Sequence, residues 1–383
     1  MVYFIFFIQI IGFSCVFLYG YVILERLWAW QKIPLLKVPE GDVPQTLLSV
    51  IVPVRNEEAN IGALLSDLKA QTYDPELIEV LVIDDYSEDK TGAEVLRFAQ
   101  TSIFPVHYKK LKKYTSKTGK KAAVEIGVAQ ATGELMVLTD GDCRVQPGWL
   151  RHIEYLYRQQ QAKFISGLVC FTESASVFEK IQLVEFASLI GVGAGSLALK
   201  KPNMCNGANI AYTRQVFNEV NGFAGNEHIP SGDDEFLMHK VFKLYPEAVF
   251  TLKSPEAVVY TSAQKQVAVF FAQRVRWASK WPAYTDIKTK LLAVLVFSVN
   301  FFILLFLGLF ILGYASGLTF ALAFGAKCLL DIWFLKPVLS FFQKHRYWVY
   351  IVPLQFIYVP YVVITALTAL KGTYNWKGRN LKT

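Results

Sequence analysis

The sequence predicts a mixed α/β fold, in which a mostly parallel β-sheet is flanked by helices and transmembrane helices stand at both ends of the chain. Three observations carry this prediction. The ends are strongly apolar, the middle alternates short apolar runs with segments of helical spacing, and acidic residues follow several of those runs. Strands that alternate with helices favour a parallel sheet with helices on its faces.

The composition limits the class of protein. Hydrophobic residues make up 53% of the 383 positions, which is too apolar for an ordinary soluble enzyme. The net charge of +8 is not gathered into a patch that would suit nucleic acid, so we expect no nucleic-acid partner. It fits a protein that lies on an anionic membrane face and handles a phosphorylated substrate. Five scattered cysteines without CxxC spacing predict neither a disulfide framework nor a zinc site.

The N-terminal apolar segment covers residues 1–24 and carries no charge. It is long enough to cross a bilayer. A signal peptide is disfavoured, because the basic start is missing and the apolar run is too long. Arg26, Lys32 and Lys37 follow at once, and the positive-inside rule then places the next segment in the cytoplasm. We expect a transmembrane helix over 1–25, in a bacterial inner membrane.

Three further apolar segments follow Lys290 and predict transmembrane or membrane-embedded helices within 291–370. They cover residues 291–313, 314–335 and 347–370. The second is less pure, since it contains Lys327 and Asp331. Three crossings from a cytoplasmic domain would place the basic tail, 371–383, outside. Either one segment is re-entrant or interfacial, or the positive-inside rule does not hold here.

Residues 26–290 are expected to form the cytoplasmic domain. Its predicted strands lie in the runs 47–54, 79–85, 105–111, 133–139, 248–253 and 257–261, and its predicted helices in 56–71, 91–100, 119–132 and 213–220. The middle of the segment 176–201 is apolar for about one membrane span, broken only by Glu185. If it crossed the membrane, the two halves of the sheet would lie on opposite sides. We therefore predict a buried or interfacial helix there.

Polar clusters stand at the ends of three predicted strands. They are Arg55–Asn56–Glu57, Asp84–Asp85 and Asp140–Gly141–Asp142. Ligands of open α/β sheets bind at the carboxyl ends of the strands. Asp140 and Asp142 on a turn could direct two carboxylates at Mg²⁺ or Mn²⁺, although Asp-Gly is also a hairpin signal. Asp84 and Asp85 could accept hydrogen bonds from a ribose or a base, or simply favour a helix N-terminus.

Two later clusters could also carry chemistry. Asp233 and Asp234 could cap a helix, and one of them could serve as a catalytic base. In the segment QRVRW, Arg276 suits phosphate oxygens and Trp277 offers a flat face for a sugar. The alternative for this segment is a basic and aromatic belt before a membrane helix.

The order of these motifs resembles the family-2 glycosyltransferases. The motifs are VIVPVRNEE, VLVIDDYSEDKT, GKKAA, LTDGDC, NGANIAYTRQVF with NGF, SGDDEFL and QRVRW, and they cover residues 47–281. The resemblance implies an inverting enzyme of the GT-A (Rossmann-like) fold, often anchored in a membrane. Such enzymes transfer a sugar from a nucleotide donor, usually a UDP-sugar.

The resemblance also implies roles for single residues. Donor-binding residues would be Glu57, Asp84, Asp85, Lys120, Asp140, Asp142 and Arg276. Asp142, with Asp140, would hold the metal, and Asp234 would be the base that deprotonates the acceptor hydroxyl. Asp233, Gln273 and Trp277 would contact the acceptor. Two positions depart from the family pattern. Glu125 stands where Asn is common, and Tyr86 follows the pair Asp84–Asp85 where Gly or Ser is frequent.

We therefore expect a metal-dependent enzyme that adds one sugar to a membrane lipid or lipid-linked glycan by single displacement. The alternative is a processive synthase of the cellulose, chitin, hyaluronan or poly-N-acetylglucosamine type, which would need enough helices to enclose a channel. A non-catalytic binding module is disfavoured because all the acids are present. A transporter is disfavoured because most of the chain has a sheet-and-helix pattern.

Overall fold

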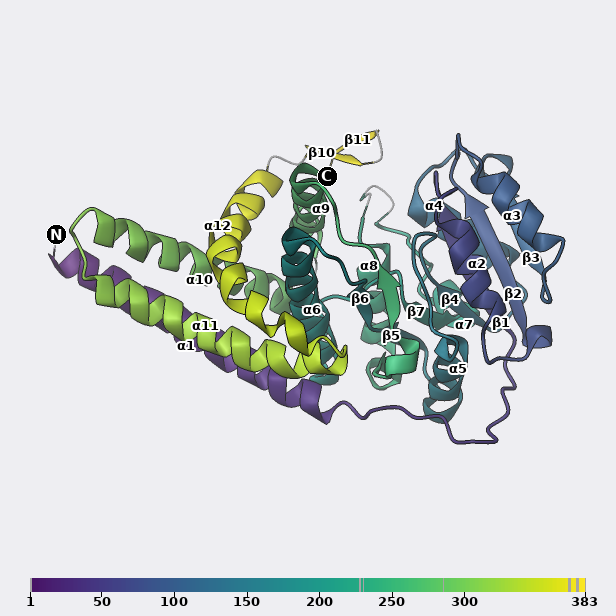
Figure 1. The fold of residues 1–383 in the computed structure, drawn as a ribbon, viewed down its shortest axis with the longest axis horizontal. Helices are drawn as coiled ribbons and strands as arrows, with labels where there is room; N and C mark the ends of the chain where they lie inside the picture. The colour runs from purple at the N-terminus through teal and green to yellow at the C-terminus, as the bar shows by residue number, and fades with distance from the viewer. Residues whose placement is uncertain are drawn as a thin grey trace. The chain divides into compact units, whose positions relative to one another are not determined.

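The computed structural model describes residues 2–226, 229, 231–284, 286–370, 373–376 and 379–382. The chain forms two compact units, each of them discontinuous in sequence. The sheet unit comprises Ile33–Thr172 and Met204–Ser262, and the helical unit comprises Met1–Lys32, Glu173–Asn203 and Ala263–Thr383. Figure 1 shows the elements of both, and we describe each unit by itself.

The sheet unit is built on a seven-stranded sheet in the order β3-β2-β1-β4-β7-β5-β8. The strands are β1 (Leu48–Val54), β2 (Ile78–Asp84), β3 (Val106–Lys110), β4 (Leu135–Leu138), β5 (Phe164–Gly167), β7 (Ile210–Thr213) and β8 (Val249–Leu252). β7 runs antiparallel to both β4 and β5, and the other neighbours pair in parallel. The predicted mixed, mostly parallel α/β fold is confirmed. A small parallel pair, β6 (Val169–Phe171) with β9 (Val259–Thr261), accompanies it.

Burial explains why these segments form strands. β2 and β4 are buried at every position, as expected for parallel strands covered by helices on both faces. The covering helices are α2 (Ile61–Lys69), α3 (Thr91–Ala99), α4 (Lys120–Gln130), α5 (Trp149–Gln160), α7 (Arg214–Glu219) and α8 (Asp233–Leu244). α4 packs closely on β1 at Gly127: a Cβ added at this glycine would lie only 2.5 Å from Ile51 Cγ2.

The strand register brings the predicted polar clusters to one edge of the sheet. Val54 pairs with Asp84, and Ile51 pairs with Leu138, in the parallel ladders of β1 with β2 and β4. The three strands therefore end near one another. The loops that carry Glu57, Asp85 and Asp140 leave from this shared edge, as the sequence predicted from strand ends alone.

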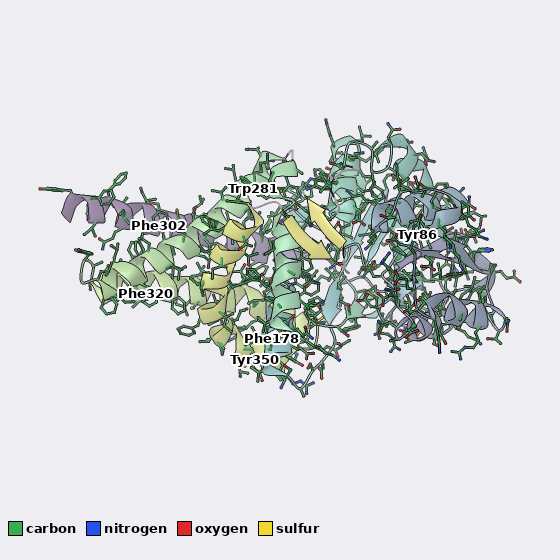
Figure 2. All side chains as sticks on the ribbon, turned by 90° about the horizontal axis from the view of Figure 1, so that it is seen from above. Tyr86, Phe178, Trp281, Phe302, Phe320 and Tyr350 are labelled. Carbon is green, nitrogen blue, oxygen red and sulfur yellow. The ribbon has the colours of Figure 1, made fainter. Side chains whose placement is uncertain are left out.

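The helical unit contains α1 (Val2–Lys32), α6 (Val177–Ala198), α9 (Val267–Ala278), α10 (Ile287–Ile311), α11 (Gly317–Phe341) and α12 (Ile351–Ala369). Among the described residues, five helices are long and apolar enough to cross a membrane, namely α1, α6, α10, α11 and the segment that ends in α12. These helices are consistent with a membrane protein. Figure 2 shows Phe302 on α10 and Phe320 on α11, whereas Tyr86 belongs to the sheet unit.

Helix α6 is mostly buried, with 72% of its most apolar window covered inside the structure. It contacts α1, α11 and α12. This burial agrees with the expectation of a buried helix over 176–201. Because α6 and α9 cluster with the apolar helices, the sheet unit is smaller than the continuous domain 26–290 expected from the sequence.

Two charged residues inside α11 form a polar link with neighbouring helices. Lys327 is fully buried, and its Nζ lies 2.7 Å from Asp331 Oδ2 and 2.6 Å from Gln355 Oε1 on α12. Tyr19 on α1 donates a hydrogen bond of 2.6 Å to Asp331 Oδ1. A buried charge is tolerated when it is paired. Lys327 and Asp331, the two charged residues in the apolar segment 314–335, therefore connect α11 to α1 and α12.

The basic tail lies partly outside the described residues. Two short strands, β10 (Thr373–Trp376) and β11 (Arg379–Lys382), pair in an antiparallel ribbon. The expected tail over 371–383 is otherwise outside the residues that the structure describes.

Candidate active site

The loops after β1 and β2 are held together by reciprocal hydrogen bonds. The amide of Asn56 donates to Ser87 Oγ at 2.9 Å, and the amide of Glu88 donates to Asn56 Oδ1 at 2.9 Å. Asn56 and Tyr86 both have positive φ angles, of 54° and 59°. Asn tolerates this left-handed conformation, but Tyr adopts it rarely. The unusual Tyr86 thus stands at a tightly constrained turn.

Glu57 is built into the same loop pair. Its amide donates to Thr91 Oγ1 at 2.8 Å, and Asn60 Nδ2 donates to its carboxylate at 2.8 Å. The side chain is largely buried. Glu57 also lies close to Gly141, because a Cβ at that glycine would lie 3.2 Å from Glu57 Cγ and 2.9 Å from Val54 Cγ1. Only a glycine lets the Asp140–Asp142 turn approach the loop after β1 so closely.

Asp84 is a structural organiser as well as a candidate donor contact. Its Oδ1 accepts a 2.8 Å hydrogen bond from the amide of Ser87, and its Oδ2 accepts one from the Tyr108 hydroxyl. Burial, with the Asp84 hydrogen bond, raises the pKa of Tyr108 above its usual value, so the phenol remains a donor. Asp85 is also buried, and its amide donates to Val54 O at 2.8 Å.

The two aspartates of the turn after β4 differ in exposure. Asp142 is exposed, whereas the Asp140 side chain is 36% exposed. The amide of Cys143 donates to Asp140 O at 3.1 Å, so a turn is present. Cys143 is buried, as expected for a small core neighbour, and this burial raises the pKa of its thiol. The turn therefore leaves one carboxylate open to solvent and the other half covered.

Lys120, the first residue of α4, connects the turn to the second acid cluster. Its Nζ lies 2.6 Å from Asp140 Oδ1 and 3.4 Å from the carbonyl of Gly207. Burial alone would lower the pKa of Lys120, but the carboxylates of Asp140, Asp233 and Asp234 raise it above its usual value. The ammonium is therefore protonated at neutral pH and lies within the field of three acids.

Asp234 lies in the first turn of α8 and is held in place by backbone amides. The amide of Gly207 donates to Asp234 Oδ2 at 2.6 Å, and the amide of Glu235 donates to Oδ1 at 2.9 Å. A Cβ at Gly207 would lie 3.0 Å from Lys120 Nζ and 3.2 Å from Asp234 Oδ2. The lysine and the carboxylate therefore meet over this glycine. Gly207 belongs to the motif NGANIAYTRQVF, but nothing in the spacing of that motif predicts that this glycine lies beside Lys120 and Asp234.

Asp233 is more buried than Asp234. Burial raises the pKa of the Tyr212 phenol on β7, and the nearby negative charge of Asp233 raises it further. The position of Asp233 within the field of Lys120 joins it to the same acid cluster. The structure thus brings together Lys120, Asp140, Asp233 and Asp234, which were predicted from three separate motifs.

The carboxylates of the turn suit a divalent cation in part. Among the described residues, no group of three or more His, Cys, Asp and Glu side chains is arranged to hold a metal. Mg²⁺ and Mn²⁺ need only one or two carboxylates where phosphate oxygens and water supply the rest. The exposed Asp142, together with the partly exposed Asp140, meets that requirement. The described residues therefore do not provide a complete metal site made of protein ligands alone.

The residues of QRVRW lie on α9 in the helical unit, and the most buried of them is Arg274. Its Nε lies 3.0 Å from Glu185 Oε1 and its Nη2 lies 2.6 Å from Glu185 Oε2, which is a bidentate pair. Both side chains are only 3% exposed. Tyr361 also donates to Glu185, at 3.3 Å. This pair gives a partner to the acid in the apolar middle of α6.

Arg274 also contacts two of the predicted acceptor residues. Gln273 Oε1 accepts a hydrogen bond from its guanidinium, and the ring of Trp277 lies 4.3 Å from its Cζ. Phe186 of α6 also packs on Trp277, at 6.2 Å between ring centroids. Arg276 is less buried than Arg274. The sequence singled out Arg276 and missed Arg274, although the unexplained Glu185 was the signal that could have found it.

Comparison with known proteins decides the family. The family model described as "Glycosyl transferase family group 2" matches residues 135–369, more than half of the chain. The chain belongs to glycosyl transferase family group 2. The model described as "Glycosyl transferase family 2" matches residues 49–220 of this glycosyl transferase, which include strands β2 to β7 and all but the first residue of β1.

Individual relatives of this glycosyl transferase are distant. It is 28% identical over 195 residues to glycosyltransferase AglE of Haloferax volcanii, covering 49% of this chain and 58% of that protein. It is 24% identical over 262 residues to a poly-beta-1,6-N-acetyl-D-glucosamine synthase of Staphylococcus epidermidis, covering 65% of this chain and 59% of that protein. The chain thus spans just under three fifths of the length of these curated relatives.

A solved structure confirms the fold. The mannosyltransferase PcManGT of Pyrobaculum calidifontis, in complex with GDP-Man and Mn²⁺, superimposes with a TM-score of 0.59 at 20% identity. The match covers 90% of this chain and 96% of that one. The predicted GT-A fold is confirmed by this similarity, which extends through almost the whole chain.

Proposed function

We propose that the protein is a metal-dependent, inverting glycosyltransferase that moves one sugar from a UDP-sugar to a hydroxyl of a membrane lipid or lipid-linked glycan. The observation that carries the proposal is the cluster in which Lys120 lies against Asp140 and within the field of Asp233 and Asp234. Family membership and the similarity to a mannosyltransferase bound to GDP-Man support the same reaction class.

Asp234 is the base in this proposal. It must accept a proton from the acceptor hydroxyl as that oxygen attacks the anomeric carbon. The amides of Gly207 and Glu235 fix both carboxylate oxygens in position, so little reorganisation is needed when the acceptor arrives. One displacement from the opposite face inverts the anomeric configuration. Asp233, beside it, is proposed to orient the acceptor.

The donor end is proposed to lie at the shared edge of β1, β2 and β4. Asp85, with Glu57 and the Asp84 loop, would receive the nucleoside, because these groups surround the carboxyl ends of the strands. Lys120 would lie beside the diphosphate, where its fixed positive charge opposes the charge that develops on the leaving group. A divalent cation held by Asp142 and Asp140 would neutralise further charge on that diphosphate. Arg276 is proposed as an additional phosphate contact.

The acceptor side is proposed to involve α9. Gln273 and Trp277 are ordered by Arg274, which is itself locked to Glu185. A tryptophan held in this way offers a rigid apolar face to a sugar or to a lipid-linked acceptor. The catalytic unit is proposed to lie on the cytoplasmic face, since basic residues flank the apolar helices there.

A second candidate is a processive polysaccharide synthase. The similarity to the poly-beta-1,6-N-acetyl-D-glucosamine synthase, over 65% of this chain, favours it. The preference for a single addition rests on the few polar faces that the C-terminal apolar helices offer for a polymer channel. Product size separates the two candidates: one added sugar supports the first, and a ladder of lengths supports the second.

The experiment that tests the proposal uses membranes containing the protein and a panel of radiolabelled nucleotide sugars. After incubation with Mg²⁺ or Mn²⁺, the lipid and polymer fractions are separated and counted. The proposal predicts label in the lipid fraction from one UDP-sugar, and none with the Asp142→Asn variant. Label from no nucleotide sugar in any fraction would contradict it.

A further inference from the structure

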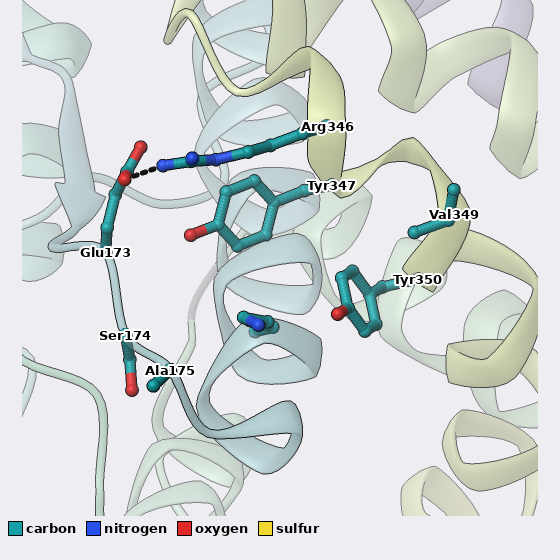
Figure 3. Close-up of a pocket in the computed structure, with 8 residues that line it drawn as sticks. Glu173, Ser174, Ala175, Arg346, Tyr347, Val349 and Tyr350 are labelled. Carbon is teal, nitrogen blue, oxygen red and sulfur yellow. Dashed lines mark ion pairs between the residues drawn. The ribbon is translucent and has the colours of Figure 1, made fainter.

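The helical unit contains a pocket that is lined by none of the residues proposed above for sugar transfer. It has a volume of about 320 Å³ and lies between the start of α6 and the short helix η6 (His345–Tyr350) that joins α11 to α12. Glu173, Ser174, Lys180, Arg346, Tyr347 and Tyr350 line it. Figure 3 shows Arg346 and the two tyrosines reaching from η6 toward the segment that carries Glu173 and Ser174.

Cationic groups outnumber acidic ones around this pocket. Arg346 forms an ion pair with Glu173, and Lys344 Nζ lies 2.8 Å from the same carboxylate. Lys180 has no carboxylate partner among the described residues, and its ammonium lies 5.8 Å from the centre of the Tyr350 ring. One carboxylate therefore faces three cations, and the pocket keeps an excess of positive charge.

The start of α6 adds to this excess. Ser176 at its N-cap makes no side-chain capping bond, so the first amides of the helix point outward uncapped by that side chain. The partial positive charge of a helix N-terminus favours an anion. This feature alone would not define a site, but here it opens beside Lys180 and Arg346, in a pocket of measurable volume.

The opposite rim of the pocket is apolar. Val349 lines it and is 70% exposed, so an aliphatic side chain is accessible to a ligand on this side of the pocket. Tyr347, Trp348 and Tyr350 flank Val349 in the sequence of η6, which begins the segment His345–Ala369 that is long and apolar enough to cross a membrane. Tyr and Trp are the residues that concentrate at the boundary between lipid headgroups and hydrocarbon.

We propose that this pocket binds the headgroup phosphate of an anionic membrane phospholipid. Lys180, Arg346 and the start of α6 would contact the phosphate, the tyrosine hydroxyls would contact the glycerol region, and Val349 would meet the acyl chains. A phosphate with its glycerol fits the volume. A free phosphate ion would leave the apolar rim uncovered, so the charge and the apolar rim together select a lipid. The proposal goes beyond sugar transfer and holds whichever acceptor the enzyme uses.

The test measures lipid retention by native mass spectrometry. Full-length protein is released from mixed micelles that contain equal amounts of phosphatidylglycerol and phosphatidylcholine. We expect retention of one phosphatidylglycerol in preference to phosphatidylcholine, and a fall in that retention of about fivefold in Lys180→Gln. Because Lys180 makes no ion pair among the described residues, the variant should melt at the wild-type temperature, so the loss is not one of folding.

Three controls make the outcome decisive. Lys265→Gln removes an exposed lysine of the same unit just before α9 and should leave retention unchanged. Glu173→Gln removes the carboxylate that competes for Arg346 and Lys344, and should raise retention. Inorganic phosphate at millimolar concentration should not displace the lipid. Equal retention of both lipids, unchanged retention in Lys180→Gln, level or lower retention in Glu173→Gln, or displacement by phosphate would each overturn the proposal.

Discussion

Lys120 Nζ lies 2.6 Å from Asp140 Oδ1, and through Gly207 the same lysine approaches Asp234. These residues come from three motifs that are widely separated in the sequence, on α4, on the turn after β4 and on α8. The lysine is the cation that allows the carboxylates to lie so close together. It therefore connects the proposed donor end of the site to the proposed base.

Replacement of Lys120 by methionine tests this connection. Methionine keeps much of the side-chain length but removes the charge, which leaves Asp140, Asp233 and Asp234 without the cation that faces all three. We expect kcat/KM for sugar transfer to fall by about 100-fold, or ~2.7 kcal/mol. The matched control is Lys117→Met, an exposed lysine in the preceding loop, which should retain wild-type kcat/KM. Equal losses in the two variants would contradict the assignment.

Asp142 is the carboxylate best placed for a cation, because it is exposed while Asp140 is engaged by Lys120. In Asp142→Asn, the affinity for UDP measured by calorimetry with Mn²⁺ should fall by at least about tenfold, and affinity measured with EDTA should not change. Asp74→Asn is the control, because Asp74 is an exposed N-cap and asparagine caps equally well. UDP affinity in Asp142→Asn that still rises normally with Mn²⁺ would remove Asp142 from the site.

Two arginines of α9 should behave in opposite ways. Arg274→Gln leaves Glu185 buried without its bidentate partner, which costs about 3–5 kcal/mol in the free energy of unfolding. Arg276→Gln should leave the melting temperature near the wild-type value and weaken UDP binding by about tenfold. Thermal unfolding and calorimetry on the same preparations distinguish them. If Arg276→Gln destabilised the protein as much as Arg274→Gln, its proposed contact with phosphate would have no support.

Glu79 predicts a pH-dependent contribution to stability. Burial alone would raise its pKa, but hydrogen bonds from Ser49 and from the amides of Thr132 and Gly133 hold the pKa below its usual value. A group with a lowered folded pKa stabilises the protein above its unfolded pKa, about 4.3, and loses that contribution as the pH falls further.

Glu79→Gln should therefore lower the free energy of unfolding by about 1 kcal/mol at pH 7, and the difference from wild type should shrink as the pH falls from about 4.5 toward 3. Thermal melts over this range measure it. The exposed Glu76→Gln is the control and should match wild type throughout. A difference between Glu79→Gln and wild type that grows toward low pH would reverse the predicted sign.

The sequence predicted the sheet because β1, β2 and β4 are continuous apolar runs that end in acids, which is a strong local signal. It did not predict α5 or β5, and it did not predict that β7 inserts antiparallel between β4 and β5. Strand order depends on contacts between residues far apart in the chain, and no local pattern encodes them. The position of Asp84 and Asp140 at one edge followed from the parallel register alone.

The sequence predicted which residues belong to the candidate site, but it did not predict how they are arranged in space. Lys120, Asp140 and Asp234 each stood in a recognisable motif, but their meeting over Gly207 depends on the fold of α4 and α8. Arg274 was missed because nothing in its own neighbourhood marks it as buried. Its partner Glu185, in the apolar middle of α6, carried the signal, since a buried carboxylate requires a cation.

The role of Asp234 as the base is tested most directly by the turnover number of Asp234→Asn at saturating donor and acceptor. Asparagine can still accept the amide hydrogen bonds of Gly207 and Glu235, but it cannot accept a proton from the acceptor hydroxyl. We expect kcat to fall by about 1000-fold or more, while the affinity for UDP stays within about twofold of wild type. A kcat within about threefold of wild type would contradict the assignment of Asp234 as the base.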